Sequence, residues 1–295
     1  MGSGMSDDEP ARNISGGESG GGAASAFAAN DESDAPLVER VVDRLGDRYW
    51  QKTYGGQDAF ECLVRTVLSQ NTSDKASQPA HDALMARYGP ASREDFELER
   101  ASDERRDPRA GEGDLAVALA DAHRPDLAET ISSAGLYNRK SETIIRLAER
   151  VRDEYGSADG FDAFVTDEDP DTVRDSLLDM KGVGPKTADC VLLFAGGRDG
   201  VFPVDTHVHR IARRMGFAPP DADHEAVREA IESELPDEKC GFGHTATIQF
   251  GRDFCKSRTP ACLDDPEACP MADLCAQVGV YPDTGEVVDP DDAAD

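Results

Sequence analysis

The sequence predicts an all-α protein, and three observations support that class. Apolar residues recur at i, i+3, i+4, i+7 and i+8 in several stretches, which is the spacing of one helix face. Runs that alternate apolar and polar residues, as half-buried strands do, are nearly absent. A glycine-rich turn separates two of the expected helices. The helix faces consist of Phe60, Leu63, Val64, Val67 and Leu68; of Ile144, Ile145, Ala148 and Val151; and of Ala188, Val191, Leu192 and Ala195.

Three segments lie outside this helical pattern. Residues 1–35 are rich in Gly, Ser, Ala and Asp and contain a single phenylalanine, so we expect them to be disordered. The polar stretch Ser92–Asp114 predicts a surface insertion. Residues 282–295 hold six acidic residues and no basic one, which predicts an acidic tail. The remaining length is enough for one or two packed domains.

The sequence contains no membrane or export signal that we can identify. No stretch reaches the roughly 18 uninterrupted apolar residues of a transmembrane helix. No basic segment followed by an apolar one opens the chain, as a signal peptide would. We therefore expect a cytoplasmic protein without a membrane partner.

The net charge of −29 is strongly acidic, whereas a nucleic-acid-binding protein usually has a basic footprint. The two ends do not account for it, because without residues 1–35 and 282–295 the chain still has 30 basic against 47 acidic residues. Lysine is scarce, with 7 Lys against 24 Arg. This balance suits very concentrated salt, where the Debye length shrinks to about 3 Å and self-repulsion is screened. We interpret the charge as a halophilic adaptation of the whole surface.

Two short stretches are locally basic. Residues 180–214 hold six basic and three acidic residues, and residues 137–152 hold five basic and two acidic residues. In so acidic a chain, we expect a polyanion to dock on these two stretches. The basic residues are Lys181, Lys186, Arg198, Arg210, Arg213 and Arg214 in the first and Arg139, Lys140, Arg146, Arg150 and Arg152 in the second.

The most informative stretch is the turn around Gly182 and Gly184. A helix is predicted to end near Met180, and Pro185 to open the next helix at its first position. Free N–H groups in the turn and the positive helix end would bind one phosphate. An ordinary αα-hairpin turn would explain the glycines alone, but the placed proline and lysine favour the phosphate site. Lys186 is a candidate nucleophile, because the helix end disfavours its ammonium form; the alternative role is a phosphate contact.

Asp205 is predicted to lie at the start of a later helix. Its commonest role there is an N-cap. Near the hairpin lysine, its carboxylate would also accept a proton and stabilise a cationic transition state. His207 and His209 lack a third metal partner nearby, so we expect them to pack or to face a phosphate.

The seven cysteines fall into distinct groups. Cys62 and Cys190 lie in apolar helical patterns and are predicted to be small buried hydrophobes, and Cys240 is placed in a loop without a role. Four others are separated by six, six and five residues. A cytosolic chain should not keep disulfides, and zinc sites usually offer closer cysteine pairs, so four thiolates around an iron–sulfur cubane fit better. These four are Cys255, Cys262, Cys269 and Cys275.

The hairpin residues 182–188, followed by residues 204–207, resemble the endonuclease III family of helix-hairpin-helix DNA glycosylases. The resemblance runs from about Pro36 to about Tyr281. It includes residues 69–74 and residues 135–138 with Lys140. Two departures are visible: the family's Leu-Pro before the hairpin is Met180-Lys181 here, and its middle cysteine gap of two residues is six here.

The resemblance implies a two-lobed fold. A helical barrel with the helix-hairpin-helix would span roughly residues 51–198, and residues 36–50 plus 199–281 would form a domain around a [4Fe-4S] cluster on the four cysteines. The added residues of the middle gap would form a bulge in the cysteine loop.

The resemblance also implies base excision repair of double-stranded DNA that contains damaged bases, oxidised pyrimidines being the family expectation, or abasic sites. Lys186 would attack the sugar C1′ with help from Asp205, and β-elimination would cut the strand. The protein would act as a monomer at the nucleoid. The DNA-contacting residues would be Gln70, Asn71, Lys181, Gly182, Val183, Gly184, Lys256 and Arg258.

Two alternatives remain open. A monofunctional mismatch glycosylase on the same scaffold would use water and lack Lys186. A non-catalytic, metal-stabilised DNA-binding protein would bind abasic DNA without cutting it.

Overall fold

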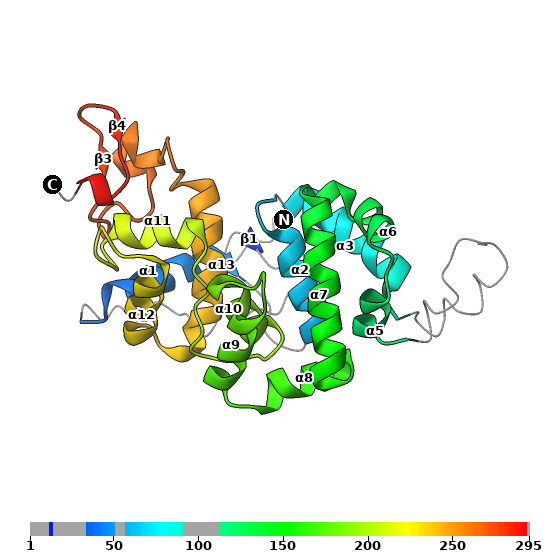
Figure 1. Cartoon of the computed structure of the whole chain (residues 1–295). Helices are drawn as coiled ribbons and strands as arrows, with labels where there is room; N and C mark the ends of the chain where they lie inside the picture. Colours follow the sequence, from blue (N-terminus) through cyan, green and yellow to red (C-terminus); the bar gives the residue numbers. More distant parts are fainter. Residues whose placement is uncertain (1–11, 14–33, 51–56, 73, 91–112, 294–295) are drawn as a thin grey trace, which may run out of the picture. The chain divides into compact units, whose positions relative to one another are not determined.

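The protein is described by a computed structural model, which covers residues 12–13, 34–50, 57–72, 74–90 and 113–293 (Figure 1). The described chain is almost entirely helical, which confirms the all-α prediction. It divides into two compact units: unit 1 contains the described residues up to 50 together with 199–293, and unit 2 contains those from 57 to 198. Most of the segment 1–35 and nearly all of the expected insertion Ser92–Asp114 lie outside the described residues.

Unit 2 is a helical domain, and several of its helices begin at residues whose side chains cap them. Asp58 and Asp169 accept hydrogen bonds from the first N–H groups of α2 and α9. The long helix α7 contacts α2, α5, α6 and α8, and α10 contacts α2 and α9. The elements are α2 (Ala59–Ser69), α3 (Asp74–Tyr88), α5 (Leu115–Ala120), α6 (Arg124–Thr130), the 3₁₀ turn η2 (Ser132–Ala134), α7 (Tyr137–Tyr155), α8 (Ala158–Asp167), α9 (Pro170–Asp179) and α10 (Pro185–Phe194).

The core of unit 2 follows the predicted helix faces closely. All five predicted residues of α2 and all four of the 188–195 series are buried. In α7 the prediction misses in one place: Ile145 is only half-buried, whereas Leu147 is 1% exposed. Cys62 and Cys190 are buried as predicted, and burial raises the pKa of the Cys62 thiol to about 12.

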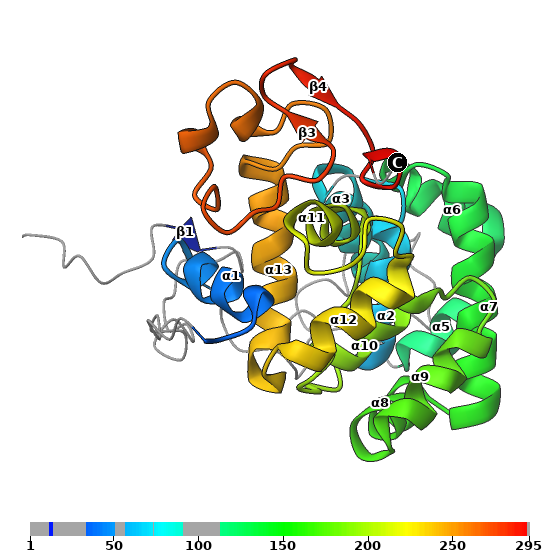
Figure 2. The ribbon, with the colours of Figure 1, turned by 90° about the vertical axis from the view of Figure 1, so that its left-hand side faces the viewer.

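Unit 1 joins an N-terminal helix to the C-terminal part of the chain. Helix α13 contacts both α1 and α11 (Figure 2). Its elements are β1 (Arg12–Asn13), α1 (Leu37–Gly46), β2 (Tyr49–Trp50), α11 (Thr206–Met215), α12 (His224–Glu234), α13 (Asp237–Asp253), the 3₁₀ turns η3 (Ala261–Leu263), η4 (Pro266–Ala268) and η5 (Asp291–Ala293), β3 (Val280–Tyr281) and β4 (Glu286–Val287).

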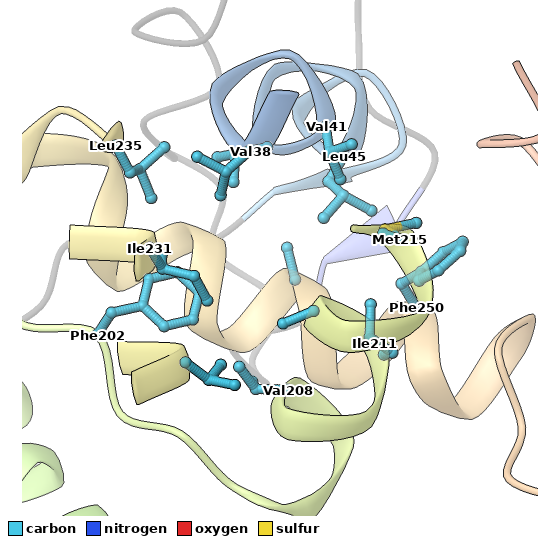
Figure 3. Close-up of a cluster of buried hydrophobic side chains, with 14 of the residues drawn as sticks. Val38, Val41, Leu45, Phe202, Val208, Ile211, Met215, Ile231, Leu235 and Phe250 are labelled. Carbon is cyan, nitrogen blue, oxygen red and sulfur yellow. The ribbon is translucent and has the colours of Figure 1, made fainter. Parts of the chain in front are cut away.

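The core of unit 1 is formed by apolar side chains from segments far apart in the sequence. Val38 of α1 lies beside Leu235, Leu45 of α1 lies beside Met215 of α11, and Phe202 lies beside Ile231 of α12 (Figure 3). Cys240 lies inside α13 and is fully buried, so its predicted place in a loop is wrong. The glycines around Cys240 suggested a loop, but the segment forms a helix whose first turn is acidic and whose inward face is apolar.

The last described residues return to unit 1. β3 and β4 pair antiparallel within the segment 280–287. Asp289, inside the expected acidic tail 282–295, accepts a hydrogen bond from Arg213 Nη1 at 2.9 Å. This contact ties the segment to α11. Within the described residues, no helix is long and apolar enough to cross a membrane.

Candidate functional site

The turn between α9 and α10 has the geometry that the sequence predicts. α9 ends at Asp179 and α10 begins at Pro185, so both predicted helix boundaries are confirmed. Gly182 has φ +106°, and a Cβ there would lie 2.7 Å from Thr143 Cγ2 of α7. Gly182 is therefore required twice, because an L side chain disfavours that φ and because α7 approaches too closely.

The space beside Gly184, at the start of α10, is open. Gly184 is its N-cap residue and makes no side-chain capping bond. No described atom lies within 4 Å of the position that a Cβ of Gly184 would take. Lys186, the second residue of α10, is half-buried, and Lys181 on the turn is exposed. A helix start with nearby lysines suits one phosphate group.

Two side chains from other helices fix this turn. Gln70 Nε2 donates to the carbonyl oxygen of Gly182 at 3.3 Å, and Arg146 Nη2 donates to that of Lys181 at 3.2 Å. Val183 is 8% exposed, and its N–H donates to the carbonyl oxygen of Met180 at 2.9 Å. The turn is therefore positioned by α7 and by the loop after α2.

The structure distinguishes the two neighbouring residues of that loop. Gln70 is half-buried and also donates from Nε2 to the Thr187 hydroxyl at 3.2 Å. Asn71 is exposed and has φ +52°, in the left-handed region. Gln70 is thus engaged with the hairpin, and Asn71 is the residue that projects.

An exposed apolar pair that the sequence analysis missed lies at the start of α7. Leu136 is 59% exposed and Tyr137 is 41% exposed, and Leu136 has φ +47° and ψ +27°. A surface pocket of about 480 Å³ lies beside them, lined by Arg124, Pro125, Ala128, Glu129, Ser132, Tyr137 and Asn138. An exposed leucine in a strained conformation is a reason to assign a function to this point. The only sequence signal was the Gly135-Leu136 pair ahead of a helix.

Asp205 lies in unit 1 as the N-cap of α11. Its Oδ1 accepts hydrogen bonds from the N–H groups of His207 and Val208, both at 2.8 Å. Asp205 therefore caps α11, and the same carboxylate oxygen, Oδ1, accepts both capping bonds. His209 stacks on His224, with ring centroids 4.0 Å apart, so it packs as predicted. Burial lowers the pKa of the His207 imidazole.

The two locally basic stretches contain buried as well as exposed basic residues, and docking of a polyanion on them stays a prediction. Arg213 and Arg214 are 6% and 3% exposed. Arg214 donates to the carbonyl oxygens of Lys256 and Ser257, and Arg210 donates to that of Cys255. These arginines lie on the inward side of α11, which counting charges along the sequence cannot reveal. Lys140, in the second stretch, is also buried.

The four C-terminal cysteines line one apolar cavity in unit 1. Met215, Phe250, Phe254, Pro260 and Val280 contribute to the same lining. Arg214 Nη1 lies 3.7 Å from the Cys255 sulfur, and the Gln277 N–H donates to the Cys275 sulfur at 3.3 Å. Four thiols with N–H donors in an apolar cavity are the donor set that an iron–sulfur cluster uses.

The thiols of this cavity are costly to ionise on their own. Burial raises the pKa of the Cys262 and Cys269 thiols, and that of Cys275 to about 12. Across the described ranges, no group of three or more His, Cys, Asp or Glu side chains is arranged to hold a metal ion. The extra residues between Cys262 and Cys269 form η4, an exposed turn. Lys256 and Arg258, between the first two cysteines, are exposed.

Comparison with known proteins identifies the family to which the chain belongs. Endonuclease III of Thermotoga maritima is 29% identical over 239 residues, which cover 81% of this chain and 92% of that protein. The fold is shared with two solved structures. One is a trapped endonuclease III–DNA covalent intermediate, at 23% identity and TM-score 0.57, and the other is a thermostable thymine-DNA glycosylase, at 20% identity and TM-score 0.57. Each match covers 86% of this chain and 92% of the other chain. Residues 64–237 match the HhH-GPD superfamily of base excision DNA repair proteins, and this chain belongs to that family.

Proposed function

We propose that this endonuclease III-like DNA glycosylase is bifunctional, removing damaged bases from double-stranded DNA and cutting the strand at the resulting abasic sites. The observation that carries the proposal is Lys186, in the first turn of α10 and two residues after Gly184. A phosphate bound at this helix start would bring a sugar within reach of the lysine. A glycosylase that used water as its nucleophile would not need an amine there.

In the proposed reaction, the Lys186 Nζ atom forms a bond with the sugar C1′ as the bond from C1′ to the base breaks. The base leaves with the bonding electron pair and takes up a proton. Asp205 would accept the proton that Lys186 loses and would stabilise the positive charge on the sugar. The C1′–O4′ bond then breaks, O4′ takes up a proton and a protonated Schiff base forms between Nζ and C1′. The Schiff base acidifies C2′, and loss of the C2′ proton forms the C2′=C3′ double bond and expels the 3′ phosphate as the C3′–O bond breaks.

Contacts to the DNA would come from two kinds of group. The backbone of Gly182 and Gly184, with Lys181, would hold one phosphate. Asn71 and Leu136 project from unit 2 and would fill the space left when the damaged nucleotide leaves the base stack. In unit 1, Lys256 and Arg258 would contact the DNA backbone.

Cys255, Cys262, Cys269 and Cys275 would hold a [4Fe-4S] cluster, which supplies a fixed cross-link among four points of the loop. Its expected role is to shape the segment that carries Lys256 and Arg258. Oxidised pyrimidines are the proposed substrates, on the resemblance to the endonuclease III family. A panel of duplexes that each carry one lesion would define the range.

The proposal is tested by trapping with borohydride, which reduces a Schiff base to a stable amine. Wild type and Lys181→Gln should each give a covalent adduct with abasic DNA, and Lys186→Gln should give none while still binding it. Lys181→Gln is the matched control, because it removes a lysine from the same hairpin. An undiminished adduct with Lys186→Gln would remove this lysine from the mechanism. Base release without any adduct in wild type would instead favour the monofunctional alternative.

A further inference from the structure

We propose that Lys140 is a positioning residue for DNA recognition, whose ammonium group holds the loops that present Asn71 and Leu136. The inference rests on the proposed function, since it assigns those two residues to DNA. Lys140 lies in the first turn of α7 and is 5% exposed. It makes no contact with the proposed chemistry and acts through the two loops.

The ammonium group uses its three N–H donors on three uncharged acceptors. Nζ donates to the carbonyl oxygen of Leu68 at 2.7 Å, to the hydroxyl of Thr72 at 2.7 Å and to the carbonyl oxygen of Ala134 at 2.9 Å. Leu68, in the last turn of α2, and Thr72 lie on either side of Asn71 along the chain, and Ala134 ends η2 two residues before Leu136. A single side chain therefore joins both loops.

The acceptors also explain why this residue carries a charge. Leu68 lies in the last turn of α2 and Ala134 ends η2, so both carbonyl groups belong to helix ends, where backbone acceptors lack helical partners. The carbonyl end of a helix carries a partial negative charge, which a lysine neutralises.

The two residues that the loops present are both conformationally strained. Asn71 has φ +52° and Leu136 has φ +47°, and among the described non-glycine residues only Gln277 shares this region. Such conformations persist where surrounding bonds over-determine them. The Thr72 hydroxyl adds a direct bond between the loops, since it lies within hydrogen-bond distance of the Ala134 carbonyl oxygen.

The same network continues to the catalytic hairpin. The Thr72 hydroxyl also lies 3.2 Å from the carbonyl oxygen of Gln70, which its one proton reaches only in place of the Ala134 carbonyl oxygen, and the Gln70 side chain donates to Gly182 and Thr187. Lys140 thus stands at one end of a polar chain that ends beside Lys186. The chain is contained in unit 2.

A buried ammonium is unfavourable for the fold unless the bonds it makes compensate. Burial lowers the pKa of Lys140, which reflects that cost. A methionine would fill the same space without the charge. The lysine at position 140 is therefore explained by the hydrogen bonds that it makes to the two loops and not by packing alone.

The first test needs no DNA. Chymotrypsin cuts after leucine and tyrosine, so cutting after Leu136 or Tyr137 reports how firmly this loop is held. Lys140→Met should be cut there at least ten times faster than wild type, and Thr72→Val at least three times faster. The control is Leu147→Ala, which weakens the buried side of the same helix and should change the rate less than twofold, with each variant kept equally far below its Tm. Equal rates for wild type, Lys140→Met and Thr72→Val would overturn the proposal.

The second test uses a duplex with a tetrahydrofuran abasic analogue, which binds without Schiff-base chemistry. Lys140→Met should bind it at least ten times more weakly than wild type does, yet bind undamaged duplex within twofold of wild type. Should Lys140→Met fail to fold, Thr72→Val carries both tests. Wild-type affinity for the analogue in both variants would overturn the proposal. If wild type itself does not prefer the analogue to undamaged DNA, the proposed function fails, and the protease result still decides whether Lys140 holds the loops.

Discussion

Gln70 Nε2 donates hydrogen bonds to the carbonyl oxygen of Gly182 and to the hydroxyl of Thr187, 3.3 and 3.2 Å away. Thr187 follows Lys186 directly, so one amide group connects the loop after α2 to both sides of the candidate nucleophile. A shift of that loop is therefore transmitted to the start of α10.

Replacing Gln70 should consequently affect chemistry more than binding. A partly exposed hydrogen bond contributes roughly 1 kcal/mol, so we expect Gln70→Ala to slow borohydride-trapped adduct formation about tenfold, because Lys186 is less well positioned. Asn71→Ala is the matched neighbour: it should weaken binding to abasic-analogue DNA and leave the rate at saturating enzyme nearly unchanged. Single-turnover rates and affinities of both variants check this. The same pattern of loss in the two variants would contradict the distinction.

Sequence chemistry predicted the hairpin well because its determinants are local. Pro185 suits the first position of a helix, and Gly182 is required by a positive φ. The same logic located Asp205 at the start of α11. The periodicity of α2 predicted its buried face because one helix face meets one core.

What sequence analysis missed depends on three-dimensional burial. Arg213 and Arg214 resemble a basic patch in the sequence, but α11 turns both inward towards carbonyl and carboxylate partners. Lys140 was included among surface charges, although its partners are 68 and 72 residues distant along the chain or on a neighbouring turn. Leu136 was overlooked because a lone exposed leucine has no periodic signal.

Asp205→Asn should separate the capping role of this residue from its proposed chemical role. Asparagine caps a helix about as well as aspartate, so the variant should fold like wild type. Loss of a positioned acid–base group typically slows a reaction by about 100-fold or more, and we expect at least that for base removal. Asp223→Asn changes the same kind of cap on α12 and is the control. A wild-type rate for Asp205→Asn would leave this residue as a helix cap alone.

The cysteine cavity predicts a specific metal content. Protein purified without oxygen should be yellow-brown and contain iron and sulfide in near-equal amounts, because a cubane holds four of each. Cys262→Ser or Cys269→Ser should lose most of the colour and lower the thermal stability of unit 1. Cys190→Ala, at a buried cysteine of unit 2, should keep its iron. Elemental analysis that finds one zinc and no iron per chain would refute the cluster.

Stability should depend on pH through His209. Burial, followed by the nearby charges of His224 and Arg213, lowers its pKa below the ordinary histidine value of about 6.5. As the pH falls below 6.5, the unfolded chain binds the proton first, so the free energy of unfolding should decrease, by up to roughly 1.4 kcal/mol per pH unit for one such group. Above pH 7 this group should contribute no slope.

His209→Phe keeps an aromatic ring against His224 but cannot titrate, so its stability should fall less steeply between pH 6.5 and 5. Urea unfolding at constant salt measures that slope, and slopes matter here more than absolute values, because the variant also loses the contact of Nε2 with the Ala222 carbonyl oxygen. Parallel slopes in wild type and His209→Phe would exclude His209 as the source.

The acidic surface leads to the last prediction, which concerns salt. Binding driven by counterion release weakens as salt rises, with a slope of about −0.9 per phosphate neutralised on B-DNA. This chain carries a net charge of −29, and several arginines of its basic stretches bond internally. Few basic side chains are therefore left to release counterions from DNA. Recognition should depend on contacts that salt screens weakly, such as those of the backbone N–H groups at Gly182 and Gly184 and of the apolar side chain of Leu136.

We therefore expect cleavage of abasic DNA to persist or increase from low to molar potassium chloride, and the protein to be partly unfolded at low salt, where acidic self-repulsion is unscreened. Circular dichroism and strand-cleavage gels across one titration measure both effects. Lys181→Gln should change the salt dependence only slightly, since one phosphate contact accounts for one unit of slope at most. Full folding and maximal activity at low salt, with steep inhibition towards molar salt, would mean that the acidic surface is not an adaptation to salt.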